Sequence, residues 1–105
     1  MDESDFDTLA TAELDHLAER LEAASEALEV DLDAEALTVE LEDGRQYLIS
    51  RHNIKREIWL SSPVSGAHHF VPGDGLWRST RGPETLRALL QQELAALLGH
   101  DVELG

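Results

Sequence analysis

Apolar residues at helical spacing open the chain. Between residues 1 and 28 they recur every three or four positions, which places them on one face of a helix. They are Phe6, Ala10, Leu14, Leu17, Leu21, Ala24 and Leu28. Acidic residues crowd the first seven positions, where negative side chains interact favourably with the helix dipole. The pattern therefore predicts a long amphipathic helix over residues 1–28.

The hydrophobic period then changes to two. Leu37, Val39 and Leu41 alternate with polar residues, which is typical of a strand with one buried face. An Asp-Gly pair at residues 43–44 follows and favours a hairpin. Further strands are expected at residues 47–51, 57–62, 68–71 and 76–79. Because the connections are too short for a crossover helix, we expect an antiparallel meander.

A second run at helical spacing closes the chain. Its apolar face consists of Leu86, Leu90, Leu94 and Leu97. Pro83 suits the first helical position, Gly99 is typical of a helix end, and Val102 and Leu104 are spaced to pack back onto the body. The chain, residues 1–105, is therefore expected to form a single α+β domain. Its predicted architecture is a two-layer sandwich, with two terminal helices on one face of an antiparallel sheet of five or more strands.

Composition and charge narrow the classes of function. The chain has no cysteine, which excludes disulfides, thiol catalysis and ligation of a metal cluster by its own thiolates. Asp and Glu number 22 against 8 Lys and Arg, for a net charge of -14. Sixteen of these acids, but only one base, lie in residues 1–43. Such a field repels nucleic acids and anionic membranes, and it attracts cations and basic protein surfaces.

A stripe of carboxylates runs along the first predicted helix, away from its apolar face. It consists of Asp15, Glu19, Glu22 and Glu26. No lysine separates them, so each like-charged pair costs on the order of 0.2–0.5 kcal/mol. Asp31 and Asp33 extend the acidic surface into a segment expected to be a loop. Oxygen ligands on a rigid face predict weak binding of hard or borderline cations, while an ordinary solvated face is the alternative.

A tryptophan marks a second candidate surface. Trp59 alternates with Ile58 and Leu60, so its indole lies on the open face of the sheet if those two residues are core. An exposed tryptophan is a good binding anchor. The alternative is an inverted strand in which Trp59 is buried. Trp77 has no such polar alternation around it and is expected to be structural.

At these residues the sequence resembles the frataxin family. The most specific match is the Ile-Trp-Leu-Ser-Ser-Pro run at residues 58–63, followed by Ser65 and Gly66. Supporting matches lie at residues 37–39, 47–49 and 75–77, and in the closing leucine-rich helix. The resemblance implies weak binding of iron, Fe²⁺ or Fe³⁺, along an acidic ridge. It also implies a role in iron–sulfur cluster assembly, through docking on the complex of a cysteine desulfurase and its scaffold protein.

Carried over by position, the family's functional residues fall on both candidate surfaces. The ridge consists of Asp15, Glu19, Glu22, Glu26, Asp31 and Asp33. Trp59 falls on the tryptophan that contacts the scaffold. Relatives usually carry Asn-x-Gln on the second strand, where this chain has Ser50, Arg51 and His52, so the amide hydrogen bonds to a partner are not carried over. His69 stands where relatives have Arg or His, and it joins these residues as a predicted partner contact.

The resemblance leaves two other functions open. One is a ferroxidase that stores iron as oligomers, and the other is an acidic adaptor that needs no metal. The leading expectation is a monomeric modulator of cluster assembly that is not an enzyme in the strict sense. It is expected in the bacterial cytoplasm, or in the mitochondrial matrix if a presequence was removed. Neither nucleic acid nor membrane is expected as a partner.

Overall fold

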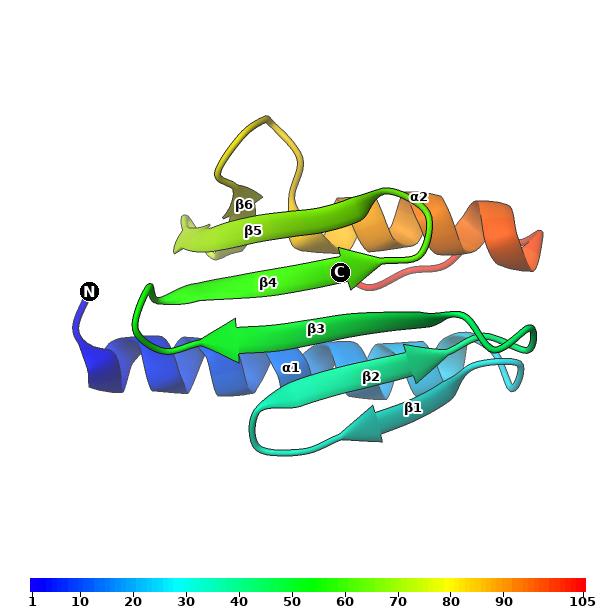
Figure 1. Ribbon diagram of the computed structural model, residues 1–105, viewed down its shortest axis with the longest axis horizontal. Coiled ribbons are helices and arrows are strands. Elements are labelled where there is room, and N and C mark those ends of the chain that lie inside the picture. Colours follow the sequence, from blue (N-terminus) through cyan, green and yellow to red (C-terminus); the bar gives the residue numbers. More distant parts are fainter.

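One antiparallel sheet of six strands lies against two helices in the computed structural model, which describes residues 1–105 (Figure 1). The elements are α1 (Glu3–Ala24), β1 (Glu29–Leu32), β2 (Ala36–Glu40), β3 (Gln46–His52), β4 (Glu57–Ser62), β5 (Gly66–Gly73), β6 (Leu76–Ser79) and α2 (Leu86–Leu98). Each strand pairs with its neighbours in the sequence, so the sheet order runs from β1 to β6. Both helices cover the same face, which confirms the predicted α+β sandwich.

The helix α1 ends at Ala24, earlier than the hydrophobic spacing predicted. It begins after Asp2, whose carboxylate accepts a hydrogen bond from the Asp5 N–H at 2.8 Å. Ser25 takes an extended conformation, and its Oγ accepts a hydrogen bond from the Ala27 N–H. Such local hydrogen bonds compete with those of the helix, and the spacing of apolar residues does not predict them. Glu26 therefore lies beyond α1, and only the other members of the predicted stripe are on the helix.

The strand β1 occupies residues that were expected to form a loop. Val30 pairs with Val39 and Leu32 with Leu37, so both apolar residues of β1 face the helices. Asp31 pairs with Thr38 and faces the other way, toward the side of the sheet that we call the open face. A short, charged edge strand of this kind resists pairing with a second sheet. Asp31 is thus held on a strand.

The core lies between the helices and the sheet and contains 21 buried apolar residues. Ile58 and Leu60 are 0% and 1% exposed, which confirms that they face inward and that Trp59 does not. The Trp77 ring meets Phe6 edge to face, with 6.0 Å between ring centroids. Trp77 is therefore structural, as predicted. Burial of one large apolar side chain contributes about 1.5–3 kcal/mol, so this layer holds the helices on the sheet.

The helix α2 begins later than predicted but ends where expected. Pro83 lies in the preceding loop, and Thr85 is the N-cap, because its Oγ1 accepts a hydrogen bond from the Ala88 N–H at 3.3 Å. Gly99 ends α2 in a left-handed conformation, with φ of 78°. Val102 and Leu104 are buried, as expected. Neither helix combines the length and the apolar character needed to cross a membrane.

Candidate functional site

The six predicted metal ligands are all exposed and follow one edge of the molecule. We call them the acidic ridge: Asp15, Glu19, Glu22, Glu26, Asp31 and Asp33. They come from α1, from the turn after it, from β1 and from the turn after β1, and α1 packs against β1. No three of the His, Asp and Glu side chains converge as a metal site would require. The ridge is therefore an open acidic surface without a preformed cage.

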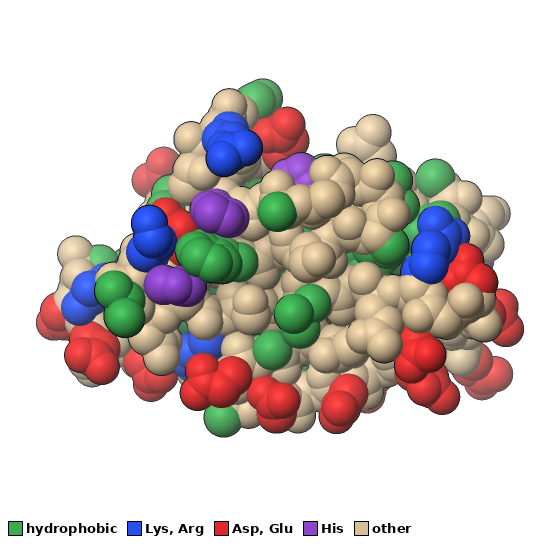
Figure 2. Space-filling model, in the orientation of Figure 1, with side chains coloured by type: hydrophobic (Ala, Val, Ile, Leu, Met, Phe, Trp, Pro, Cys, Tyr) green, Lys and Arg blue, Asp and Glu red, His purple; other side chains and the backbone are tan.

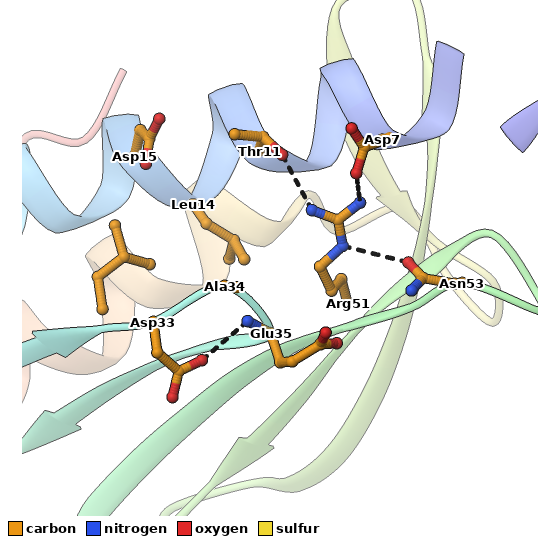
Figure 3. A pocket seen from close by; sticks show the side chains of 10 residues that line it. Asp7, Thr11, Leu14, Asp15, Asp33, Ala34, Glu35, Arg51 and Asn53 are labelled. Atoms are coloured by element: carbon orange, nitrogen blue, oxygen red, sulfur yellow. Dashed lines mark hydrogen bonds and ion pairs between the residues drawn. The ribbon is translucent and has the colours of Figure 1, made fainter. Parts of the chain in front are cut away.

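Two ridge residues line a cleft of about 580 Å³ between α1 and the β1–β2 turn (Figure 3). Asp15 lies on its helix wall, and Asp33 and Glu35 lie on its turn wall. Asp33 accepts hydrogen bonds from the backbone N–H groups of Glu35 and Ala36 at 2.8 and 2.9 Å. These two bonds hold the pKa of Asp33 below its usual value, so the side chain keeps its charge at neutral pH. Carboxylates from two elements therefore line the cleft, but they do not converge on one point in it (Figure 3).

Arg51 closes one end of this cleft and lies apart from Trp59. It pairs with the core residue Ile58, so it points to the helix face of the sheet. Its guanidinium donates to Asp7 and to Thr11 Oγ1 on α1, and its side chain is only 7% exposed. It also lies 5.7 Å from the centroid of the Phe6 ring. Arg51 therefore joins α1 to β3, and its guanidinium faces away from the surface around Trp59, contrary to the predicted partner contact.

Trp59 lies half-buried on the open face, held between two imidazole rings. The ring centroids of His52 and Trp59 are 4.2 Å apart, and those of Trp59 and His69 are 4.4 Å apart. The Trp59 Nε1–H donates to Glu57 Oε1 at 2.8 Å. Strand register builds this arrangement, since Trp59 pairs with Ser50 on one side and with His69 on the other. We call His52, Trp59 and His69 the histidine–tryptophan stack.

A carboxylate that the sequence analysis did not single out organises the other end of β4. Glu93 of α2 accepts hydrogen bonds from Tyr47, Ser62 and Ser65, with the first two at 2.9 and 2.6 Å. Burial alone would raise the pKa of Glu93, but these hydroxyl donors lower it below its usual value. The serines of the family-like motif therefore tie the β4–β5 turn to α2. No local pattern signals Glu93, because its partners lie far away in the sequence.

A second pair missed from the sequence joins the two helices. Glu13 is 5% exposed, and its carboxylate receives two hydrogen bonds from the Arg87 guanidinium at 2.7 and 2.9 Å. His16 donates from Nε2 to the Leu104 carbonyl, which fastens the C-terminal tail to α1. Glu13 and His16 are thus committed to structural contacts near the ridge. None of the six ridge carboxylates takes part in an ion pair.

The sheet and its two helices have the fold of a frataxin-like protein. The family model described as "Frataxin-like domain" matches residues 1–100, and the chain belongs to this family. One relative is the "Iron-sulfur cluster assembly protein CyaY" of Vibrio cholerae serotype O1. The two sequences are 39% identical over 97 residues, which cover 89% of this chain and 88% of the relative.

Solved structures give the same result for the fold. Frataxin from Psychromonas ingrahamii superimposes with a TM-score of 0.91 over 100% of this chain and 99% of that one, at 22% identity. Trimeric frataxin from the yeast Saccharomyces cerevisiae, complexed with ferrous iron, has a TM-score of 0.72 and 29% identity. That match covers 94% of this chain and 88% of the yeast chain. The yeast protein is an oligomer, so the monomer expected here stays a prediction.

Proposed function

We propose that this protein binds ferrous iron weakly along the acidic ridge and acts in iron–sulfur cluster assembly by docking on a cysteine desulfurase–scaffold complex. The names of the relatives support the general role, since the matched bacterial protein is called an iron–sulfur cluster assembly protein. The ferrous complex of the yeast relative supports iron as the ion. The observation that carries the proposal is the ridge itself: six exposed carboxylates on one edge with no neutralising partner.

The geometry of the ridge explains why iron binding should be weak. Side chains spaced along a rigid helix and an edge strand do not wrap an ion, so water must complete its coordination. Carboxylate oxygens suit hard and borderline cations such as Fe²⁺. Because no three carboxylates converge, we expect hydrated ions to be held along the whole ridge, including the cleft that Asp15 and Asp33 line. Iron in this proposal is cargo and is held by the surface only loosely.

The same charges give the ridge a role in docking. A strongly negative edge attracts a basic protein surface and speeds the encounter with it. Trp59 then supplies a desolvated contact of the kind that dominates binding energy. Ser50 is its cross-strand neighbour, and His52 and His69 flank its ring, so these residues form the remainder of the proposed scaffold contact. The ridge and the indole act on different parts of the partner complex.

An anaerobic ferrous titration tests the ridge. The variant E19Q/E22Q/E26Q removes three ridge charges, and E84Q/D101N/E103Q removes three exposed charges elsewhere. We expect the ridge variant to lose several-fold in ferrous affinity by calorimetry, while the matched control stays close to the parent protein. Equal losses in both variants would mean that net charge, and not the ridge, collects the ion.

A second candidate function is iron storage by an oligomeric ferroxidase. The trimeric, ferrous-bound yeast relative favours it over the metal-free adaptor. Two measurements distinguish iron storage from the proposed modulator function. They are oxygen uptake on addition of ferrous iron, at catalytic protein concentration, and sedimentation velocity. Turnover of many ferrous ions per chain with growth of large oligomers would support storage, whereas a constant sedimentation coefficient without oxygen uptake would support the modulator.

A further inference from the structure

The end of the open face around Trp59 is basic, although the net charge of the chain is -14. Figure 2 shows His and Lys or Arg side chains around a hydrophobic patch at this end, with some acidic side chains beside them and a longer row of acidic side chains along the lower edge. Lys55 and Arg56 lie in the β3–β4 turn. Arg78 of β6 pairs with Val71 of β5, and both face the open side because their neighbours Trp77 and Phe70 are buried. We call Lys55, Arg56 and Arg78 the basic rim.

The acidic residue within this region is already engaged. The Glu57 side chain is 17% exposed, and its Oε1 accepts the indole hydrogen bond and lies 3.6 Å from His69 Nδ1. Its negative charge offsets one of the three positive charges of the rim, so the rim and Glu57 together keep a net charge of +2. By contrast, the Arg56 Nε is shielded from solvent and has no hydrogen-bond partner. That nitrogen is out of reach of a partner, so Arg56 contributes to the surface only through the positive charge of its guanidinium.

Apolar side chains accompany the rim on the same end of the molecule. Ile54, at the tip of the β3–β4 turn, is 87% exposed, and Val71 is 36% exposed. Trp59 is held flat by two stacked rings and one hydrogen bond, so little side-chain entropy remains to be lost when a partner packs on it. A preformed aromatic anchor with apolar neighbours and a basic rim is a docking surface. Its charge excludes a basic segment, and the overall field repels nucleic-acid phosphates.

We propose that this surface binds an acidic segment of a partner protein, in which an apolar side chain packs on Trp59 and carboxylates pair with the basic rim. The inference rests on the proposed function only in assuming a protein partner at Trp59, and it adds the chemistry of the bound segment. It also gives the molecule two docking surfaces of opposite selectivity. The ridge takes basic or cationic groups, and the basic rim takes acidic ones, so a partner complex can be bound in one orientation only.

The test uses the full chain, labelled with ¹⁵N, and two synthetic peptides as probes. One is acetyl-Glu-Asp-Leu-Pro-Asp-Glu-amide, and the other has lysine in place of each acid. We expect the acidic peptide to shift the Trp59 indole resonance and the amides of His52 and Arg78. The basic peptide should shift resonances of the ridge instead. If the acidic peptide leaves the Trp59 indole unmoved, the proposal is wrong.

Matched variants separate the basic rim from bulk charge. K55Q/R78Q removes two rim charges, and R20Q/R45Q removes two exposed charges on other parts of the surface. Each exposed ion pair contributes only a modest free energy of binding. Removing two of them should therefore lower the affinity for the acidic peptide by about three- to tenfold. The control variant should bind it as the parent does. Equal affinity of K55Q/R78Q and R20Q/R45Q would overturn the assignment of the rim.

Titration with a desulfurase–scaffold complex distinguishes failure of this inference from failure of the proposed function. Binding of the acidic peptide without binding of the complex would retain the acidic-segment surface and reject the proposed partner. Binding of the complex through Trp59, with an affinity that K55Q/R78Q does not change, would retain the partner and reject the acidic segment. Loss of complex binding in K55Q/R78Q but not in R20Q/R45Q would support both.

Discussion

Glu93 shows how one side chain fixes a turn and makes stability depend on pH. Its carboxylate collects three hydroxyl donors from β3, β4 and the β4–β5 turn, and they outweigh the effect of burial on its pKa. Because the pKa of the folded state is lowered, the stability from Glu93 is present above the unfolded value of about 4.3. It is lost as the pH falls through the lower pKa of the folded protein.

The change Glu93→Gln tests this residue. At about pH 7 we expect the free energy of unfolding to fall by about 1 kcal/mol, a modest value because the carboxylate is half-exposed. The difference from the parent protein should shrink as the pH falls below the usual glutamate pKa and the parent carboxylate becomes protonated. Urea unfolding at several pH values measures this. The exposed Glu84→Gln serves as the control, and a difference that is constant with pH would contradict the pKa shift.

For single residues, the sequence predicted the face on which a side chain lies but not the side chains that it contacts. Alternation placed Trp59 on the open face, and the structure confirms it. The same alternation, continued from Ile49, puts Arg51 on the helix face, yet a buried arginine is acceptable only with partners. Those partners, Asp7 and Thr11, lie on α1 and more than thirty residues away in the sequence. No local sequence pattern therefore predicts these contacts. The stack of His52 and His69 on Trp59 depended in the same way on strand register.

The ends of the elements are set by single residues with special backbone conformations. Gly99 ends α2 with φ of 78°, and a Cβ added there would meet nothing within 4 Å. Any cost of Gly99→Ala is therefore conformational and should be about 1–2 kcal/mol. Gly73 also has open space around it but no positive φ, which makes Gly73→Ala the matched control. Thermal unfolding should show a lower melting temperature for Gly99→Ala than for the parent protein. The melting temperature of Gly73→Ala should be almost unchanged.

The element boundaries that the sequence missed have a common cause. Leu28 continued the helical spacing beyond Ala24, but Ser25 had already turned the chain with its own hydrogen bond. Pro83 looked like a helix start, yet the hydroxyl of Thr85 does the capping. The strand β1 is short and acidic, and its apolar residues are stabilised by β2 and α1. Periodicity reports which face is buried, whereas caps and edge strands depend on contacts that periodicity does not contain.

The whole molecule is stabilised by its core against its own charge. Adjacent carboxylates on α1 repel one another, and the net charge of -14 adds electrostatic repulsion of longer range. Raising the salt concentration from about 0.02 M to about 0.5 M shortens the range of this repulsion. We therefore expect the melting temperature to rise with salt, contrary to a protein held together by surface ion pairs.

The ridge variant E19Q/E22Q/E26Q links this instability to function. It should gain roughly 0.5–1 kcal/mol in free energy of unfolding at low salt, because two like-charged pairs along α1 disappear. The gain should vanish at high salt, where the repulsion is already screened. Calorimetric unfolding at both salt concentrations measures it. A destabilised variant would show that these carboxylates make structural contacts and would remove the argument that they are kept for binding.

The order of the elements other than β1, their buried faces and the charge asymmetry were determined by the sequence alone, because period, turn residues and composition are local properties. The residues of the frataxin-like motif could be recognised in the same way. The tertiary structure decided which side chains meet: Arg51 with α1, Glu93 with three hydroxyls, and Trp59 with two imidazoles and a basic rim. These contacts join segments distant in the chain, and they follow only from strand register and from the packing of both helices on one face of the sheet.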